Sequence, residues 1–235
     1  MQRYFSNKLE NNKFELNSDD IYHITKVMRM KTGDSIEVVY NNEVYICNLE
    51  IDNTVNAFIK SKEETKTPKK FEKVLIIPLL KEQKMDLILQ KSTELGVDKI
   101  IPVIMERSIV KLENGKETKK LDRWNKICKE ASEQSKRIDI PLITNVKVLK
   151  ELENIEGLKI VCSTKEKDNT IKKYLNDNKN YTSINVVIGP EGGISPKEEE
   201  YLNSIGFDSV SLGENIMRVE TVPMYILSVI NYENM

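Results

Sequence analysis

The chain has 235 residues, of which 39% are hydrophobic and 31% charged, and its formal net charge is −1 at pH 7. This length is enough for one large domain or two small ones with a sizeable core. The charge argues against a protein that coats polyanions in general, although it permits a local basic face. There is no apolar run of membrane-spanning length and no signal-peptide pattern, so we expect a cytoplasmic protein without a membrane partner.

Histidine and cysteine usage excludes several chemistries. His23 is the single histidine, so a histidine-ligated metal or a Ser-His-Asp triad would lack partners. Cys47, Cys128 and Cys162 are scattered singly, without a C-x-x-C pair, which indicates neither a disulfide framework nor a thiolate metal site. We therefore expect no metal and three reduced, mostly buried thiols.

The first sixty residues contain short β-rich runs, at 35–40, 43–49 and 55–59. Asn41-Asn42 between the first two predicts a tight hairpin turn. Residues 18–29 have helical periodicity, with Ser18 as the expected N-cap. These elements predict a small, mixed, barrel-like domain, and the polar stretch 60–70 predicts a linker after it.

Beyond the linker the pattern changes to alternating strands and helices. Expected strands are 74–79, 100–104, 142–146, 159–162, 184–188 and 209–212, and expected helices are 81–95, 121–136, 150–153, 169–175, 196–205 and 222–232. Ser195-Pro196 with Glu198 predicts a capping box, while Gly96 and Gly206 are expected to end their helices. Such alternation predicts an α/β fold with a mainly parallel sheet and helices on both faces.

Two glycine-bearing loops, 188–193 and 211–221, each follow a strand-like run and lead into a helix. Ligands of α/β proteins bind where strands end in this way. Neither loop has the spacing of a Rossmann fingerprint or a P-loop, so the ligand is not expected to be held by its phosphates. Ordinary strand-to-helix turns, which also use glycine, are the alternative that local pattern leaves open.

The loops and several other segments carry a family resemblance. Gly-Pro-Glu-Gly-Gly at 189–193, Ser-Leu-Gly at 211–213 and Ile-Met-Arg-Val-Glu-Thr at 216–221 resemble the last two knot loops of the bacterial 16S ribosomal RNA uracil-N3 methyltransferases (RsmE) of the SPOUT class. Further matching segments are 3–5, 23–29, 90–97, 106–108, 123–124 and 130–135. The resemblance covers essentially the whole chain.

The resemblance implies two domains and a cofactor. It implies a PUA-like RNA-binding barrel with its linker at 1–67, a SPOUT methyltransferase domain at 68–235 with a trefoil knot in roughly 160–235, and a homodimer. S-adenosylmethionine would lie in three loops, against Ser163, Thr164, Gly189, Pro190, Glu191, Gly192, Gly193, Leu212, Gly213, Ile216 and Met217. Glycines allow close backbone approach and apolar side chains would wall the purine, although plain core packing is the ordinary role of such apolar residues.

The expected chemistry is methyl transfer to uracil N3, which must lose its proton. Arg218 would stabilise the developing anion, and Glu220 would orient the base or accept the proton. Glu191 is a second candidate base, with hydrogen bonding to loop amides as its alternative role. The chain departs from the family pattern at Val219 and Val222, where Thr and Ala are usual. Because valine lacks the threonine hydroxyl, we expect no catalytic role for a hydroxyl at position 219.

The expected partner is 16S ribosomal RNA or the small ribosomal subunit. Candidate RNA contacts are Arg3, Lys26 and Arg29 on the small domain and Arg107 and Arg137 on the large one. Residues 111–137, with nine basic and five acidic residues, could form a basic face or a solvated helix surface, and His23 could contact RNA or be structural. The alternative functions are a ribose 2′-O-methyltransferase of the same knotted class and a non-catalytic RNA-binding ribosome assembly factor.

Overall fold

The computed structural model describes residues 1–64, 71–111, 115 and 117–234, and the chain forms two compact units. The first, the barrel unit, consists of Met1–Pro68 and Lys129–Ile140; the second, the sheet unit, consists of Lys69–Cys128 and Pro141–Met235. Helix α3 (Glu117–Gln134) therefore begins in the sheet unit and ends in the barrel unit. Among the described helices, none is both long and apolar enough to cross a membrane.

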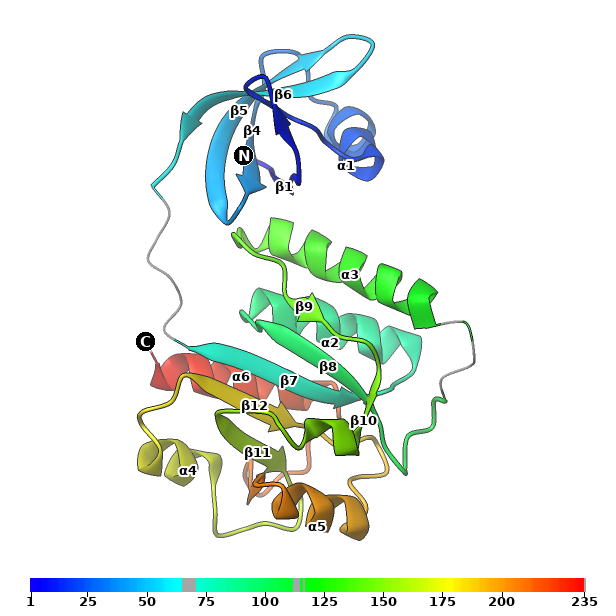
Figure 1. Cartoon of the computed structure of the whole chain (residues 1–235), viewed down its shortest axis with the longest axis vertical. Helices are drawn as coiled ribbons and strands as arrows, with labels where there is room; N and C mark the ends of the chain where they lie inside the picture. Colours follow the sequence, from blue (N-terminus) through cyan, green and yellow to red (C-terminus); the bar gives the residue numbers. More distant parts are fainter. Residues whose placement is uncertain (65–70, 112–114, 116, 235) are drawn as a thin grey trace. The chain divides into compact units, whose positions relative to one another are not determined.

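The barrel unit is built on one curved sheet (Figure 1). Its strands run in the order β1-β4-β5-β6-β3-β2, and only the β1–β4 pair is parallel. Their bounds are β1 Arg3–Phe5, β2 Leu9–Glu10, β3 Lys13–Phe14, β4 Ser35–Tyr40, β5 Glu43–Ile51 and β6 Val55–Lys62. Alternate residues such as Ile36 and Val38 on β4 and Cys47 and Leu49 on β5 share one core, as a barrel-like sheet requires.

Paired asparagines make two of the turns in this sheet. Asn41 and Asn42 both have positive φ, at 51° and 61°, and join β4 to β5, which confirms the predicted hairpin. Asn11 and Asn12, at 49° and 61°, do the same between β2 and β3, a hairpin that the sequence reading missed. Apart from glycine, asparagine is among the residues that most readily adopt this left-handed backbone conformation.

The helical segment of the barrel unit differs from the prediction in two ways. Asn17, not Ser18, is the N-cap of α1 (Ser18–Tyr22), because its side chain accepts a hydrogen bond from the Asp20 amide at 2.8 Å. The second half, η1 (His23–Val27), is a π-helical turn rather than a continuation of the α-helix. The start of the predicted linker is also wrong, since Lys60 to Lys62 belong to β6, where Ser61 and Lys62 pair with β5. Residues 65–70 lie outside the described residues.

The sheet unit has an entirely parallel sheet among its described strands, as predicted. The order is β10-β8-β7-β12-β11-β13, and β9 pairs with β8. The strands are β7 Glu72–Pro78, β8 Lys99–Ile104, β9 Leu142–Ile143, β10 Lys147–Val148, β11 Leu158–Cys162, β12 Ser183–Val187 and β13 Asp208–Val210. Register pairs Val187 with Ile76 and Val161, and Cys162 with Val210, so the carboxyl ends of four strands are level.

Helices cover both faces of this sheet (Figure 1). Their bounds are α2 Glu82–Glu94, α3 as given, η2 Leu149–Leu152, α4 Ile171–Asp177, α5 Pro196–Ser204 and α6 Thr221–Glu233. Leu75 and Ile77 face α2, α3, α4 and α6, whereas Val74 and Ile76 face η2 and α5. The predicted capping box of α5 is confirmed, and Gly96 and Gly206, at φ 80° and 89°, follow α2 and α5.

A buried charged group joins the end of α3 to the barrel unit's own helix. The Lys129 ammonium lies 2.5 Å from Asp20 and 2.8 Å from Glu133. Burial, together with the Asp20 charge, raises the pKa of the Glu133 carboxyl to about 7 despite the neighbouring Lys129. Burial likewise raises the pKa of Asp20, so one ammonium faces two carboxyls that are both costly to ionise.

This group predicts how the stability of the barrel unit depends on pH. Glu133 has its folded pKa raised above the ordinary 4.5, so it stabilises the fold fully below about pH 4.5 and loses this contribution as pH rises through about 7. The slope contributed by one such proton is at most about 1.4 kcal/mol per pH unit. Glu133→Gln should flatten the pH dependence of the urea unfolding free energy in this window. Glu130→Gln, on the exposed side of α3, should leave it unchanged.

Candidate functional site

The three glycine-containing or polar loops predicted to bind a ligand begin at one edge of the sheet. They follow β11, β12 and β13, whose carboxyl ends are level because the strands are parallel and in register. The chain builds outward from β7 to β8 in one direction, and β12, β11 and β13 extend the sheet in the other. The edge between β7 and β12 is thus a topological switch point, where α/β proteins bind ligands.

A cation with two carboxylates lies at this switch point. Lys84, in the first turn of α2 after β7, is 3.0 Å from Glu191 in the loop after β12 and 3.5 Å from Glu220 before α6. The Glu220 side chain is only 17% exposed, and its Oε2 has this ion pair but no hydrogen bond. Sequence reasoning missed Lys84, although a lysine one turn after a central strand end was a usable signal.

The surroundings of Glu191 favour the ionised form of its carboxyl. Partial burial of Glu191 opposes its ionisation, but its own backbone amide and the Lys84 ammonium outweigh burial and lower the pKa of the carboxyl. The bond to Glu191 in turn raises the pKa of Lys84. A carboxylate held in its ionised form is a weak proton acceptor, so this geometry favours the alternative anchoring role of Glu191 over the role of base.

Arg218 and Glu220 flank a buried residue where α6 begins. The Arg218 carbonyl accepts hydrogen bonds from the amides of Thr221 at 2.8 Å and Val222 at 3.3 Å, and its side chain is exposed. Val219, between them, is buried in the core of the sheet unit, and Val222 packs against the same core. The two departures from the family pattern therefore serve packing, and Arg218 and Glu220 lie on either side of Val219.

The loop after β12 needs glycine for close packing. A Cβ on Gly189 would lie 2.7 Å from Cγ1 of Ile194, and one on Gly192 would lie 3.1 Å from Cβ of Arg107. The amide of Gly193, at φ 72°, donates to the Pro190 carbonyl at 2.8 Å. Arg107 donates to the Gly192 carbonyl at 3.0 Å, so the exposed Arg107 side chain lies against this loop.

The loops after β11 and β13 offer main chain and apolar surface. The buried Ser163 hydroxyl donates to Glu199 of α5 and accepts from the Lys165 amide at 3.2 Å, so it orders its loop. Thr164 beside it is exposed. Gly213 has φ 119° with open space where a Cβ would point.

The apolar residues predicted to wall a purine are available. Ile216 is 82% exposed, which is unusual for isoleucine, while Leu212 and Met217 are half-buried. A nucleoside held by main-chain groups and apolar walls needs such a surface beside glycine loops. The main-chain groups and apolar side chains of these loops therefore fit the predicted cofactor, S-adenosylmethionine. Among the described residues, no group of three or more His, Cys, Asp or Glu residues could hold a metal.

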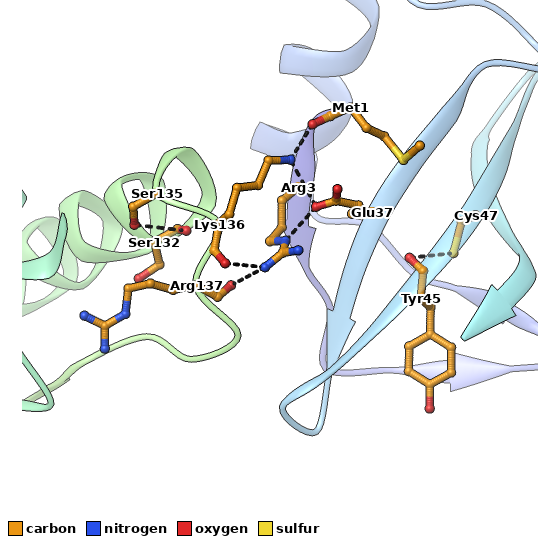
Figure 2. A network of polar contacts seen from close by, with 9 residues as sticks. All are labelled: Met1, Arg3, Glu37, Tyr45, Cys47, Ser132, Ser135, Lys136 and Arg137. Atoms are coloured by element: carbon orange, nitrogen blue, oxygen red, sulfur yellow. Dashed lines mark hydrogen bonds and ion pairs between the residues drawn. The ribbon is translucent and has the colours of Figure 1, made fainter. Parts of the chain in front are cut away.

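Two of the five predicted RNA contacts are buried and ion-paired within the barrel unit. Arg3 is only 8% exposed, pairs with Glu37 at 2.7 Å, and donates to the carbonyls of Lys136 and Arg137 (Figure 2). The Arg137 side chain is equally buried, pairs with Asp139 at 3.1 Å, and belongs to the barrel unit rather than the large domain. Both arginines therefore stabilise this unit. The other three candidates, Lys26, Arg29 and Arg107, are exposed.

The remaining titratable candidates are structural. His23 Nδ1 lies 2.9 Å from the Tyr4 hydroxyl, and the two rings pack edge to face. The three cysteines are free thiols; Cys47 and Cys128 are buried and Cys162 is partly exposed. Burial raises the pKa of the Cys47 and Cys162 thiols to about 12, so neither is a nucleophile at neutral pH.

Comparison with known proteins gives this architecture a class. Residues 67–231 match the RNA methyltransferase domain family, and residues 16–59 match the RNA methyltransferase PUA domain family. The chain is 31% identical over 251 aligned positions to the ribosomal RNA small subunit methyltransferase E of Bacillus subtilis, covering 99% of this chain and 97% of the relative. It is 33% identical to the protein of the same name from Mesomycoplasma hyopneumoniae, covering 97% and 98%.

Solved structures agree over the whole chain. A methyltransferase from Legionella pneumophila, in complex with S-adenosylmethionine, superposes with a TM-score of 0.90 at 28% identity and covers 98% of this chain and 96% of its own. The ribosomal RNA small subunit methyltransferase E of Neisseria gonorrhoeae, also bound to S-adenosylmethionine, has a TM-score of 0.88 at 27% identity, with 99% and 97% covered.

Fold and site thus define an RNA methyltransferase of the SPOUT type that carries a PUA domain. Within that class, the chain belongs to the ribosomal RNA small subunit methyltransferase E family. Family membership, the class of enzyme and the cofactor inferred from sequence are confirmed, because both solved relatives hold S-adenosylmethionine. The alternative of a non-catalytic RNA-binding assembly factor is not supported, because the relatives are methyltransferases.

The ion-paired cluster predicts that Lys84 supports methyl transfer. Lys84→Met should lower kcat by about tenfold or more, because Glu191 and Glu220 would then lie close without their shared ammonium. Two unneutralised carboxylates raise each other's pKa, so the acid limb of the pH–rate profile should also move to higher pH. Lys91→Met removes a lysine of the same helix, paired with Glu94, and should change neither. Equal activity of the two variants would contradict the role of the cluster.

Proposed function

We propose that this enzyme transfers a methyl group from S-adenosylmethionine to N3 of a uracil in small-subunit (16S) ribosomal RNA. The observation that carries the proposal is the partly buried Glu220 carboxylate, paired with Lys84 and next to the exposed Arg218, at the edge where three ligand loops begin. A base, a cation and a donor platform at one edge suit a substrate whose N–H proton must leave. The names of the relatives support ribosomal RNA of the small subunit as the substrate.

The cofactor, when bound, supplies an electrophilic methyl group on a positively charged sulfur. The chain's part is to hold the nucleoside portion with the loops 163–164, 189–193 and 212–217. Glycines at 189, 192, 193 and 213 keep side chains out of this path. The apolar surface comes from Leu212, Ile216 and Met217, which are at least partly exposed. A nucleoside that covers these side chains would exclude water from them.

Glu220 is the side chain that would accept or orient the N3 proton. Its Oε2 is buried, lacks a hydrogen bond and has Lys84 at 3.5 Å, so this oxygen has acceptor capacity that the described residues leave unused. Arg218 would lie against a uracil carbonyl, where negative charge gathers as the proton leaves. Its guanidinium has no ion-pair partner among the described residues, so it is available to contact the substrate. Glu191 fixes Lys84 between the two loops.

The runner-up is ribose 2′-O-methylation, which relatives of the same knotted class could carry out with similar loops. It would leave the base edge free. A carboxylate acceptor is useful in either reaction, and the product distinguishes the two.

The product and the base can be tested together. Ribosomal RNA from a strain lacking the gene, incubated with the purified enzyme and S-adenosylmethionine, should gain a methyl group on a uracil base, detected by nucleoside mass spectrometry. The modified position should also stop reverse transcription, because N3 methylation blocks the Watson–Crick edge. Glu220→Gln should lower kcat roughly 100-fold, within the range for a catalytic acid–base group.

The control is Glu200→Gln, an exposed carboxylate on α5 outside the three loops, which should retain full activity. A methyl group found on ribose would overturn the assignment to uracil N3. Equal activity of the Glu220 and Glu200 variants would remove Glu220 from the mechanism.

We further propose a homodimer and a knotted C-terminal segment, both of which the family resemblance implies. Helix α6 leaves Tyr225 and Tyr232 exposed, at 38% and 75%, and α2, which packs beside α6, leaves Leu87 exposed. Such apolar residues on neighbouring helices suit a subunit interface.

The dimer is checked by solution mass. Tyr225→Glu combined with Tyr232→Glu should convert the protein to a monomer in light scattering and abolish methyl transfer, while the circular dichroism spectrum stays native. Lys172→Glu, an exposed change on α4, should stay dimeric and active. A native enzyme that is monomeric and fully active would contradict the proposal.

A further inference from the structure

Helices α1 and η1 expose an aromatic residue between cations. Tyr22, Lys26 and Arg29 all lie on the exposed side of this segment, three and four residues apart. Tyr22 is 63% exposed, and Val27 and Met28 at the end of η1 are 56% and 40% exposed. Single exposed apolar residues are common, but an aromatic ring grouped with two further apolar side chains and basic residues indicates a binding surface.

Basic residues predominate on this surface, and the exposed Asp19 lies one turn before it on α1. Residues 21–33 contain Lys26, Arg29 and Lys31 but no carboxylate, and all three cations are exposed. Within the part of the chain that the structure describes, none of the three has an ion-pair partner. By contrast, several other cations of the barrel unit are paired with carboxylates, namely Arg3, Lys8, Lys62, Lys129, Lys136 and Arg137. The surface therefore suits a polyanion rather than an acidic side chain of this unit.

The backbone beneath the ring is held in place. Ile24 is fully buried, and the Tyr4 hydroxyl bonds His23 Nδ1 from below at 2.9 Å. The π-helical turn brings the Met28 amide to the His23 carbonyl at 2.8 Å, and Arg29 then closes the helix at φ 53°. A non-glycine residue in that conformation is strained, and glycine would relieve the strain. π-Turns occur often at functional sites.

We propose that the surface formed by Tyr22, Lys26, Val27, Met28 and Arg29, here called the stacking surface, binds single-stranded RNA by stacking one unpaired base on the Tyr22 ring. Lys26 and Arg29 neutralise the flanking phosphates. An aromatic ring with cations on either side recognises an unstacked base, whereas a duplex offers phosphates but no free base face. The inference rests on the proposed function, because it takes RNA as the substrate.

Binding of a labelled single-stranded oligouridylate to the full-length protein, measured by anisotropy, tests the stacking. Tyr22→Ala should weaken binding about tenfold, within the range for loss of one stacked base, and should leave binding of a duplex of equal length unchanged. Tyr22→Phe should bind as the wild type does. Tyr22→Leu keeps apolar area without an aromatic face and should be as weak as Tyr22→Ala.

The phosphate contacts have a separate signature. Lys26→Ala should weaken both single strand and duplex and reduce the salt dependence of binding. Asn53→Ala, on the exposed turn between β5 and β6, should change nothing. Thermal unfolding of the Tyr22 variants should match the wild type, because the side chain packs in no core.

Several outcomes would overturn the inference. Unchanged single-strand affinity of Tyr22→Ala would remove the stacking, and normal binding by Tyr22→Leu would indicate an apolar protein partner instead. An enzyme that methylates a uracil base in ribosomal RNA with an unaltered KM in Tyr22→Ala would refute the stacking surface alone. An enzyme that produces no methylated uracil base would refute the proposed function.

Discussion

The parallel register of the sheet unit is the constraint on which the site depends. The strands β7, β8, β11 and β12 contribute buried side chains to the cores on both faces of the sheet, so their neighbours are fixed by packing rather than by local turns. Because the pairs Ile76–Val187, Val161–Val187 and Cys162–Val210 level the strand ends, loops far apart in sequence begin at the same edge. A slip of one residue would exchange the two faces of a strand and withdraw its loop.

Charge is distributed differently in the two units. In the sheet unit, one ammonium, Lys84, is shared by two carboxylates at the ligand edge, while Arg218 remains exposed. In the barrel unit, Arg3, Arg137 and Lys129 are used to pack the chain. Lys26, Arg29 and Lys31, in and after η1, are exposed and have no ion-pair partner among the described residues. A count of basic residues would not separate these uses, since burial decides which cations can contact a polyanion.

Much of the fold could be predicted from periodicity and capping chemistry. The alternation of strands and helices predicted the parallel sheet. Asn41-Asn42 predicted a hairpin and Ser195 with Glu198 predicted a helix start, because each pattern is local in the sequence. The π-turn η1, the division of α3 between the units and the burial of Arg3 depend on tertiary packing that no short window contains. Lys84 was missed for the same reason: its partners lie over a hundred residues away in the chain.

Helix α3 is divided between the two units, so the barrel unit is not one continuous segment of the chain. Although two domain families match in succession, the barrel unit takes Lys129 from beyond the start of the methyltransferase match. Asp20, whose side chain is 5% exposed, would lose this cation if the chain were cut at the linker. The excised N-terminal segment would lose this cation together with residues 129–140 that complete the unit, so it is not a portable module. Shuffling of this RNA-binding unit between proteins would require the end of α3 to travel with it.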